Sequence, residues 1–144
     1  MKFGTTTSLY YAAAAVTTAI AGILHLIVAS NVIQLSMNNG IFFIAAGIAQ
    51  IFWALPMVKR WGRLWYYIGI GGTIILIILW AMTRLPNNPI TGERPFPINA
   101  MGITIEILQI AYIILTAMII VKERSNNNRR VGAHRQISKK TNSF

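Results

Sequence analysis

The stretch LWYYIGIGGTIILIILWAM, residues 64–82, contains nineteen consecutive residues without a charged side chain. A helix needs about 20 apolar residues to cross the hydrocarbon core of a bilayer. Three further runs, residues 8–29, 40–58 and 99–121, are similarly long and apolar, and none of the four contains Lys or Arg. Because hydrocarbon offers no hydrogen-bond partners to the backbone, each run should be a helix. The sequence predicts an all-α integral membrane protein, folded as an antiparallel bundle of four transmembrane helices.

The composition of the whole chain agrees with this fold class. Of its 144 residues, 55% are hydrophobic and only 11% are charged, and the mean hydropathy is +0.56. The absence of cysteine excludes disulfides, thiolate metal sites and iron–sulfur clusters. We find no phosphate-binding loop, metalloprotease helix motif or nucleophile–base pair. The sequence therefore predicts neither catalytic activity nor a cofactor for this chain.

Basic residues gather on one side of the predicted bundle. With both termini inside the cell, eleven Lys and Arg lie on the inner side, against Arg84 and Arg94 on the outer side. Short cytoplasmic segments of membrane proteins carry such an excess of positive charge. We therefore predict a multi-pass protein of the plasma membrane, with both termini in the cytoplasm and the proline-rich connection 83–98 outside.

The last 23 residues, 122–144, are polar and strongly basic, with seven Lys and Arg against one Glu. They show no apolar periodicity, so we expect a disordered cytoplasmic tail, separate from the bundle of residues 1–121. Basic residues beside a bilayer attract anionic headgroups. The residues expected to bind anionic lipid are Lys59, Arg60, Arg63, Lys122, Arg124, Arg129 and Arg130. Nucleic acid is not an expected partner, because no aromatic residues alternate with the basic ones.

Small and polar residues predict which helix faces pack together, because lipid solvates Leu and Ile as well as a protein core does. At about 100° per residue, each run has one small and polar stripe and one aliphatic stripe. The small and polar stripes are Ala14, Ala15, Thr18, Gly22, His25 and Ala29; Phe43, Ala46, Gly47, Gln50 and Ala54; Gly69, Thr73, Leu76 and Trp80; and Gly102, Glu106, Gln109, Ile113, Thr116 and Ala117. These four stripes should face one another.

Five polar residues on or beside these stripes form the candidate intramembrane polar cluster: His25, Gln50, Arg84, Glu106 and Gln109. Glu106 is the most informative of them, because an unpaired charge within a membrane costs at least about 2.5–3.5 kcal/mol. It could form a structural pair with Arg84 or His25, or it could carry protons or cations. One imidazole and one carboxylate are too few ligands for a metal site, so none is predicted within the chain.

Several short segments resemble a known family. They are GILHL at 22–26, GIFFIAAGIAQ at 40–50, WAMTR at 80–84, and Gly102 with Glu106. They are similar to a pattern in small, uncharacterised four-helix membrane proteins of actinobacteria and ammonia-oxidising archaea, and the resemblance covers roughly residues 20–120. The Ile-rich, cysteine-free sequence is more similar to the archaeal branch. In those organisms, small helical proteins serve as accessory subunits of the copper-dependent ammonia monooxygenase.

Two functions follow as hypotheses. The first is a non-catalytic accessory or assembly subunit of a larger membrane complex, with other integral membrane subunits as partners. The resemblance makes ammonia monooxygenase the candidate complex. The second is a small transporter or a proton- or metal-handling protein centred on Glu106 and His25.

Overall fold

The computed structural model describes residues 5–93 and 95–141, with the side chains of 7–93, 95–133, 135 and 137. This part of the chain contains four helices and no strand. The helices are α1 (Thr5–Val32), α2 (Met37–Lys59), α3 (Arg63–Met82) and α4 (Ala100–Thr141). Each is long and apolar enough to cross a membrane. The predicted all-α fold with four candidate membrane spans is therefore confirmed.

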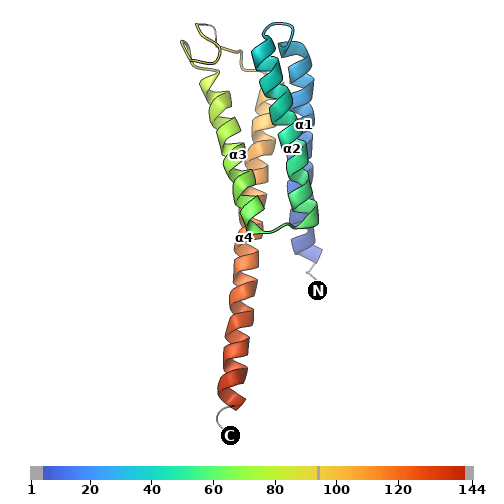
Figure 1. Cartoon of the computed structure of the whole chain (residues 1–144), viewed down its shortest axis with the longest axis vertical. Helices are drawn as coiled ribbons and strands as arrows, with labels where there is room; N and C mark the ends of the chain where they lie inside the picture. Colours follow the sequence, from blue (N-terminus) through green and yellow to red (C-terminus); the bar gives the residue numbers. More distant parts are fainter. Residues whose placement is uncertain (1–4, 94, 142–144) are drawn as a thin grey trace.

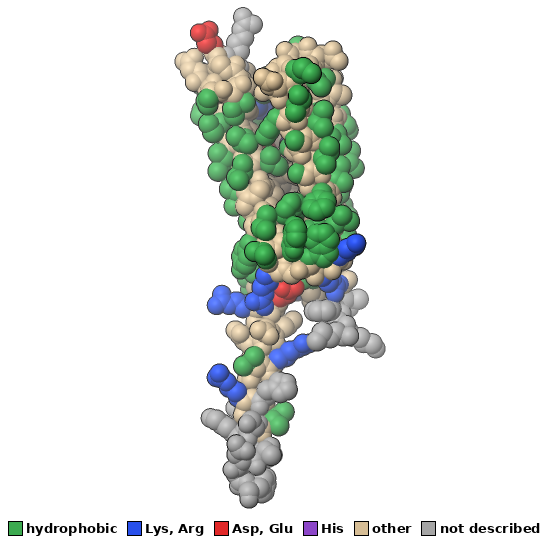
Figure 2. Space-filling model, in the orientation of Figure 1, with side chains coloured by type: hydrophobic (Ala, Val, Ile, Leu, Met, Phe, Trp, Pro, Cys, Tyr) green, Lys and Arg blue, Asp and Glu red, His purple; other side chains and the backbone are tan. Residues whose placement is uncertain are grey.

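The helices run alternately up and down, and α4 continues well beyond the other three (Figure 1). We call the end of the bundle that carries the connection 83–99 the loop end, and the opposite end the stalk end. The stalk is residues 122–141 of α4, which extends for about 30 Å at 1.5 Å per residue. On the face shown in Figure 2, apolar side chains cover the bundle, and Lys and Arg gather where the bundle meets the stalk.

The closest helix pair is α1 with α2, and two glycines bring their backbones together. A methyl group added to Gly22 would lie 2.6 Å from the carbonyl oxygen of Gly47. Next to this crossing, Thr18 Oγ1 donates a hydrogen bond to the carbonyl oxygen of Gln50, at 3.1 Å. By contrast, α3 stands apart from this pair (Figure 1), and α2 with α3 is the weakest of the four helix contacts.

The predicted disorder of the tail is wrong for residues 122–141, because α4 continues through them to Thr141. Nucleation is the costly step in helix formation, whereas each added residue gains one further hydrogen bond. The apolar part of α4 supplies the nucleus, and residues 122–141 contain no proline to end the helix. The other helix boundaries, including the start of α4 at Ala100, lie within three residues of the predicted ones. Of the counted basic residues, Lys2 and Arg94 lie outside the described part of the chain.

Nearly all residues of the four predicted stripes are turned inward. Ala14, Thr18, Gln50 and Thr116 are among the buried residues. Ala117 is the exception, because it is exposed at the edge of the stripe on α4. The predicted stripes do not include several large side chains that are buried near the stalk end. These are Tyr11, Met57, Tyr66, Tyr112 and Ile119.

The connection 83–99 is held by its own polar groups. The side chain of Asn88 donates to the carbonyl oxygen of Leu85 at 2.7 Å and accepts from the backbone N–H of Thr91 at 2.8 Å. The Oδ1 atom of Asn99 accepts from the Gly102 N–H at 2.7 Å, which satisfies an otherwise free donor at the start of α4. These bonds fix the path of the chain at the loop end.

Candidate functional site

Glu123 joins three helices at the stalk end. Its carboxylate accepts a hydrogen bond from the hydroxyl of Tyr11 on α1. It also forms an ion pair with Arg63, the first residue of α3, with Nε and Oε2 3.6 Å apart. The rings of Tyr11 and Tyr66 pack with their centroids 6.0 Å apart. Sequence analysis had assigned Glu123 to the tail, so this connection was missed.

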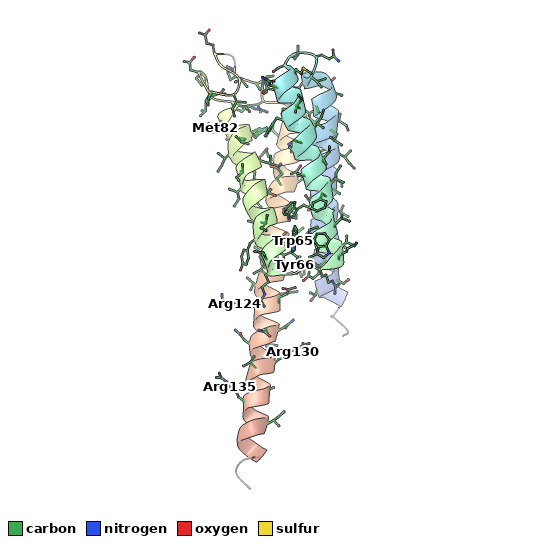
Figure 3. All side chains as sticks on the ribbon, viewed as in Figure 1. Trp65, Tyr66, Met82, Arg124, Arg130 and Arg135 are labelled. Atoms are coloured by element: carbon green, nitrogen blue, oxygen red, sulfur yellow. The ribbon has the colours of Figure 1, made fainter. Side chains whose placement is uncertain are left out.

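Aromatic side chains fill the stalk end above Glu123. Trp53 packs against Trp65 at 5.9 Å between ring centroids, and its indole N–H donates to the carbonyl oxygen of Trp65 at 3.1 Å. Gly69 makes this packing possible, because a side chain there would collide with Trp53 and with the hydroxyl of Tyr112. Trp65 and Tyr66 lie where α3 begins, far from Met82 at the loop end (Figure 3).

The five residues of the predicted polar cluster do not form one connected network. Toward the loop end, His25 is buried, and its Nδ1 lies 3.0 Å from the carbonyl oxygen of Ala21 one helical turn earlier. Its ring packs against that of Phe43, with centroids 5.7 Å apart. Gln50 and Gln109 are also buried, and Gln109 has no hydrogen-bond partner for its amide among the described residues.

Arg84 lies just beyond α3 and folds back onto it. Its guanidinium sits over the ring of Trp80, 4.6 Å from the centroid, and donates to the hydroxyl of Thr83 at 2.7 Å. Desolvation by the surrounding chain lowers the pKa of Arg84, while the nearby charge of Glu106 opposes that shift. The guanidinium nevertheless stays protonated, because arginine is not deprotonated in proteins.

Glu106 is buried, with 9% of its surface exposed. Within the described residues it has neither a hydrogen bond nor an ion pair, so the expected direct pair with Arg84 or His25 is not formed. The two charges of Arg84 and Glu106 still act on each other through space. The interpretation of Glu106 as one half of a structural pair with Arg84 or His25 is therefore less well supported than the sequence indicated.

Two adjoining cavities of about 230 Å³ each occupy the loop end. Both are lined by His25, Phe43, Trp80 and Phe96, and Arg84 lines the second. A third cavity, of about 190 Å³, lies between α2 and α3 in the middle of the bundle and is lined by Gln50 and Thr73. His25, Gln50 and Arg84 therefore each border a cavity that residues of α3 also line.

The residues predicted to bind anionic lipid fall into two groups. Lys59, Arg60, Arg63, Lys122 and Arg124 surround the stalk end. The guanidinium of Arg60 sits over the ring of Tyr11, and Lys122 lies 4.2 Å from the ring centroid of Tyr10. Arg129 and Arg130 lie farther along the stalk, and Figure 3 shows Arg130 between Arg124 and Arg135. Because the stalk is helical, the second group extends away from the bundle.

Comparison with known proteins finds no matching family, no matching curated protein and no matching solved structure. The described residues contain no group of three His, Asp or Glu side chains placed to hold a metal ion. The loop-end cavities and the partly covered helix α3 are therefore the features of the described chain that bear on its function.

Proposed function

We propose that this chain is a non-catalytic accessory or assembly subunit of a larger membrane protein complex. The observation that carries the proposal is the poor coverage of α3. Only 17% of its most apolar window is buried within the chain, against 39% for α1 and for α4. A side chain at Gly71 or Gly72 would meet no neighbour within 4 Å. Glycines on an exposed membrane helix allow another helix to approach closely, so α3 offers a surface to a second subunit.

Unpaired polar atoms beside α3 support the same proposal. Gln50 lines the middle cavity, and its buried side-chain oxygen makes no hydrogen bond of ordinary geometry within the described chain, where its amide interacts with His25. Polar atoms in hydrocarbon require a partner, and a neighbouring subunit can supply one. The stalk adds a second contact region, because a helix that is polar on all sides is typical of a bridge to another component.

Site-specific photo-crosslinking in the native membrane tests the proposal. A photoreactive residue at position 72, on the exposed side of α3, should crosslink to an integral membrane protein of another sequence. The same residue at position 20, on the exposed side of α1, is the matched control and should crosslink to lipid alone. The resemblance described above makes subunits of archaeal ammonia monooxygenase the first candidates to identify. Equal crosslinking from both positions, or products with lipid only, would contradict the proposal.

We also propose the orientation with both termini in the cytoplasm and the loop end outside. The gathering of basic residues at the stalk end supports it. A cysteine introduced at Ile90 in the loop should react with a membrane-impermeant label on intact cells. A cysteine at Gly62, in the turn between α2 and α3, should react only after permeabilisation. The reverse labelling pattern would overturn the orientation.

A transporter or proton-handling protein centred on Glu106 and His25 is the second candidate function. It is favoured by one observation, because Glu106 is buried without a direct partner and His25 lines the loop-end cavities. Purified protein in sealed vesicles should then conduct protons, and Glu106→Gln should abolish the flux without changing thermal stability. Absence of proton flux from folded wild-type protein would exclude proton handling by Glu106 and favour the accessory role.

A further inference from the structure

Buried hydroxyl groups lie between the middle cavity and the stalk end. Tyr112 on α4, Tyr66 on α3 and Tyr11 on α1 are each at most 3% exposed and belong to one packed core. We call these three residues the tyrosine chain. Phenylalanine would fill an apolar core without bringing a polar group into it, and burying a polar group costs free energy. The three hydroxyls therefore suggest a role beyond packing.

At the stalk end, direct contacts connect the tyrosine chain to water. Tyr11 donates a hydrogen bond to the carboxylate of Glu123. The ring of Tyr66 packs against that of Tyr11, with centroids 6.0 Å apart, and the two side chains also interact through their hydroxyls. The side chain of Glu123 is 24% exposed. A proton that arrives on Glu123 can therefore leave the bundle at the stalk end.

At its other end the tyrosine chain reaches the middle cavity. The hydroxyl of Tyr112 lies beside Gly69, because a side chain added at Gly69 would collide with it. Gly69 itself lines the middle cavity, whose volume of about 190 Å³ is enough for several water molecules. The hydroxyls of Tyr112 and Tyr66 are buried and make no hydrogen bond of ordinary geometry within the described chain. The Tyr112 hydroxyl is thus placed to bind water at the cavity wall.

Gln50 and His25 extend the line of polar groups toward the loop end. Gln50 lines the middle cavity and its amide interacts with His25, which borders both loop-end cavities. The Nδ1 atom of His25 lies 3.0 Å from the carbonyl oxygen of Ala21. That carbonyl holds a proton on Nδ1, so Nε2 is the basic nitrogen of the neutral ring. His25 can therefore accept a proton between the loop-end cavities and the middle cavity.

A path of hydroxyl groups suits protons and no larger cation. A hydroxyl oxygen can accept one proton while it donates another, so the transfer requires no open passage. Tyr66 and Tyr112 are closely packed, with at most 1% of their surface exposed, and leave no room for a hydrated ion. Along α4, positions 112 and 123 are about 16 Å apart, which is roughly half the thickness of the hydrocarbon core. The tyrosine chain thus crosses the closely packed half of the bundle.

We propose that the tyrosine chain is the stalk-end half of a proton path that leads from His25 through Gln50 and the middle cavity to Glu123. This inference rests on the second candidate function and names its ion and its route. A proton passes from water in the middle cavity to the oxygen of Tyr112. Each hydroxyl in turn releases its own proton to the next, and Tyr11 gives the last one to the carboxylate of Glu123. Only O–H bonds form and break, and no net charge stays on a tyrosine.

Proton flux into sealed vesicles that contain the full-length protein tests the path. Tyr66→Phe and Tyr112→Phe each keep the ring and remove one hydroxyl, so each should lower the flux at least about tenfold. Because the hydroxyls act in series, the double variant should lower the flux no further than the slower single variant. Tyr67→Phe removes an exposed hydroxyl next to Tyr66 and is the matched control, with unchanged flux. Thermal unfolding identifies the variants that are folded, and either single variant decides the outcome if the other is not.

Three results would overturn the proton path. Flux that persists in folded Tyr66→Phe and Tyr112→Phe but is lost in Glu106→Gln would reject this route and leave the second candidate function standing. Wild-type protein without proton flux would remove that function together with its route. Sodium flux at a rate similar to that of protons would also contradict the path, because a chain of hydroxyls passes protons alone.

Discussion

The stalk end and the loop end of the bundle contain the same four helices but are packed differently. At the stalk end Tyr66 and Met57 have no exposed surface, and Glu123 connects α4 with both α1 and α3. At the loop end two cavities remain, and Nε1 of Trp80 and Nε of Arg84 have no acceptor among the described residues. The contrast separates a closely packed end of the bundle from an end that contains cavities.

Connection length also differs between the two ends. Three residues, 60–62, join α2 to α3 at the stalk end, whereas seventeen residues, 83–99, join α3 to α4 at the loop end. The short turn does not hold α2 and α3 together along their length, because theirs is the weakest of the four helix contacts. Large aromatic side chains fill the stalk end instead, where Trp53 and Trp65 pack against the buried core. The following four predictions test this contrast, from the largest expected effect to the smallest.

Removing a large ring should cost far more at the stalk end than at the loop end. Tyr66→Ala should lower the free energy of unfolding by about 3 kcal/mol, because it leaves a cavity in close packing. Phe43→Ala should cost less than half as much, since that ring already borders empty space. Unfolding in detergent micelles measures both losses. Equal losses would show that the two ends are packed equally well.

Adding one methyl group on α3 should have opposite effects at two glycines three residues apart. Gly69→Ala should destabilise the protein by about 1–3 kcal/mol, because the methyl group collides with Trp53 and Tyr112. Gly72→Ala meets no neighbour and should leave stability unchanged or slightly raised, since Ala favours the helix. The same unfolding assay compares the two variants. A loss at Gly72 as large as that at Gly69 would contradict the close packing at the stalk end.

Replacing either Glu123 or Glu106 with glutamine should also distinguish the stalk end from the loop end. Glu123→Gln should destabilise by about 1 kcal/mol, because it loses the ion pair with the half-exposed Arg63 and weakens the bond from Tyr11. That loss should shrink at high salt. Glu106→Gln should have a smaller effect, since Glu106 has no direct partner among the described residues. A larger loss at Glu106 would indicate that it holds the loop end together.

Shortening the stalk should have the smallest effect on the bundle. Truncation after Arg124 keeps Glu123 and every apolar run, so stability should stay within about 0.5 kcal/mol of the full chain. Truncation after Val121 also removes Glu123 and should reproduce the loss expected for Glu123→Gln. Thermal unfolding of both shortened chains provides the comparison. A marked loss on removing residues 125–144 alone would show that the stalk supports the bundle.

The sequence by itself determined the number of helices, their approximate bounds and the faces they turn inward. These properties are local, because an apolar run of sufficient length and a 3.6-residue period can be recognised without knowing what lies opposite. His25, Gln50, Glu106 and Gln109 were placed correctly on buried faces for this reason. The stalk was predicted wrongly because composition alone does not show that a helix already formed will continue.

Only the tertiary structure decided which side chains meet. Among the described residues, Glu106, within an apolar run, has no ion pair with an arginine, whereas Glu123, just beyond that run, pairs with Arg63 from the start of α3. The packing of Tyr11 against Tyr66 and the two cavities of the loop end likewise depend on how whole helices are placed, and therefore on their rotation, tilt and connections. Helix periodicity specifies a direction for each side chain, but a contact also requires the position of its partner.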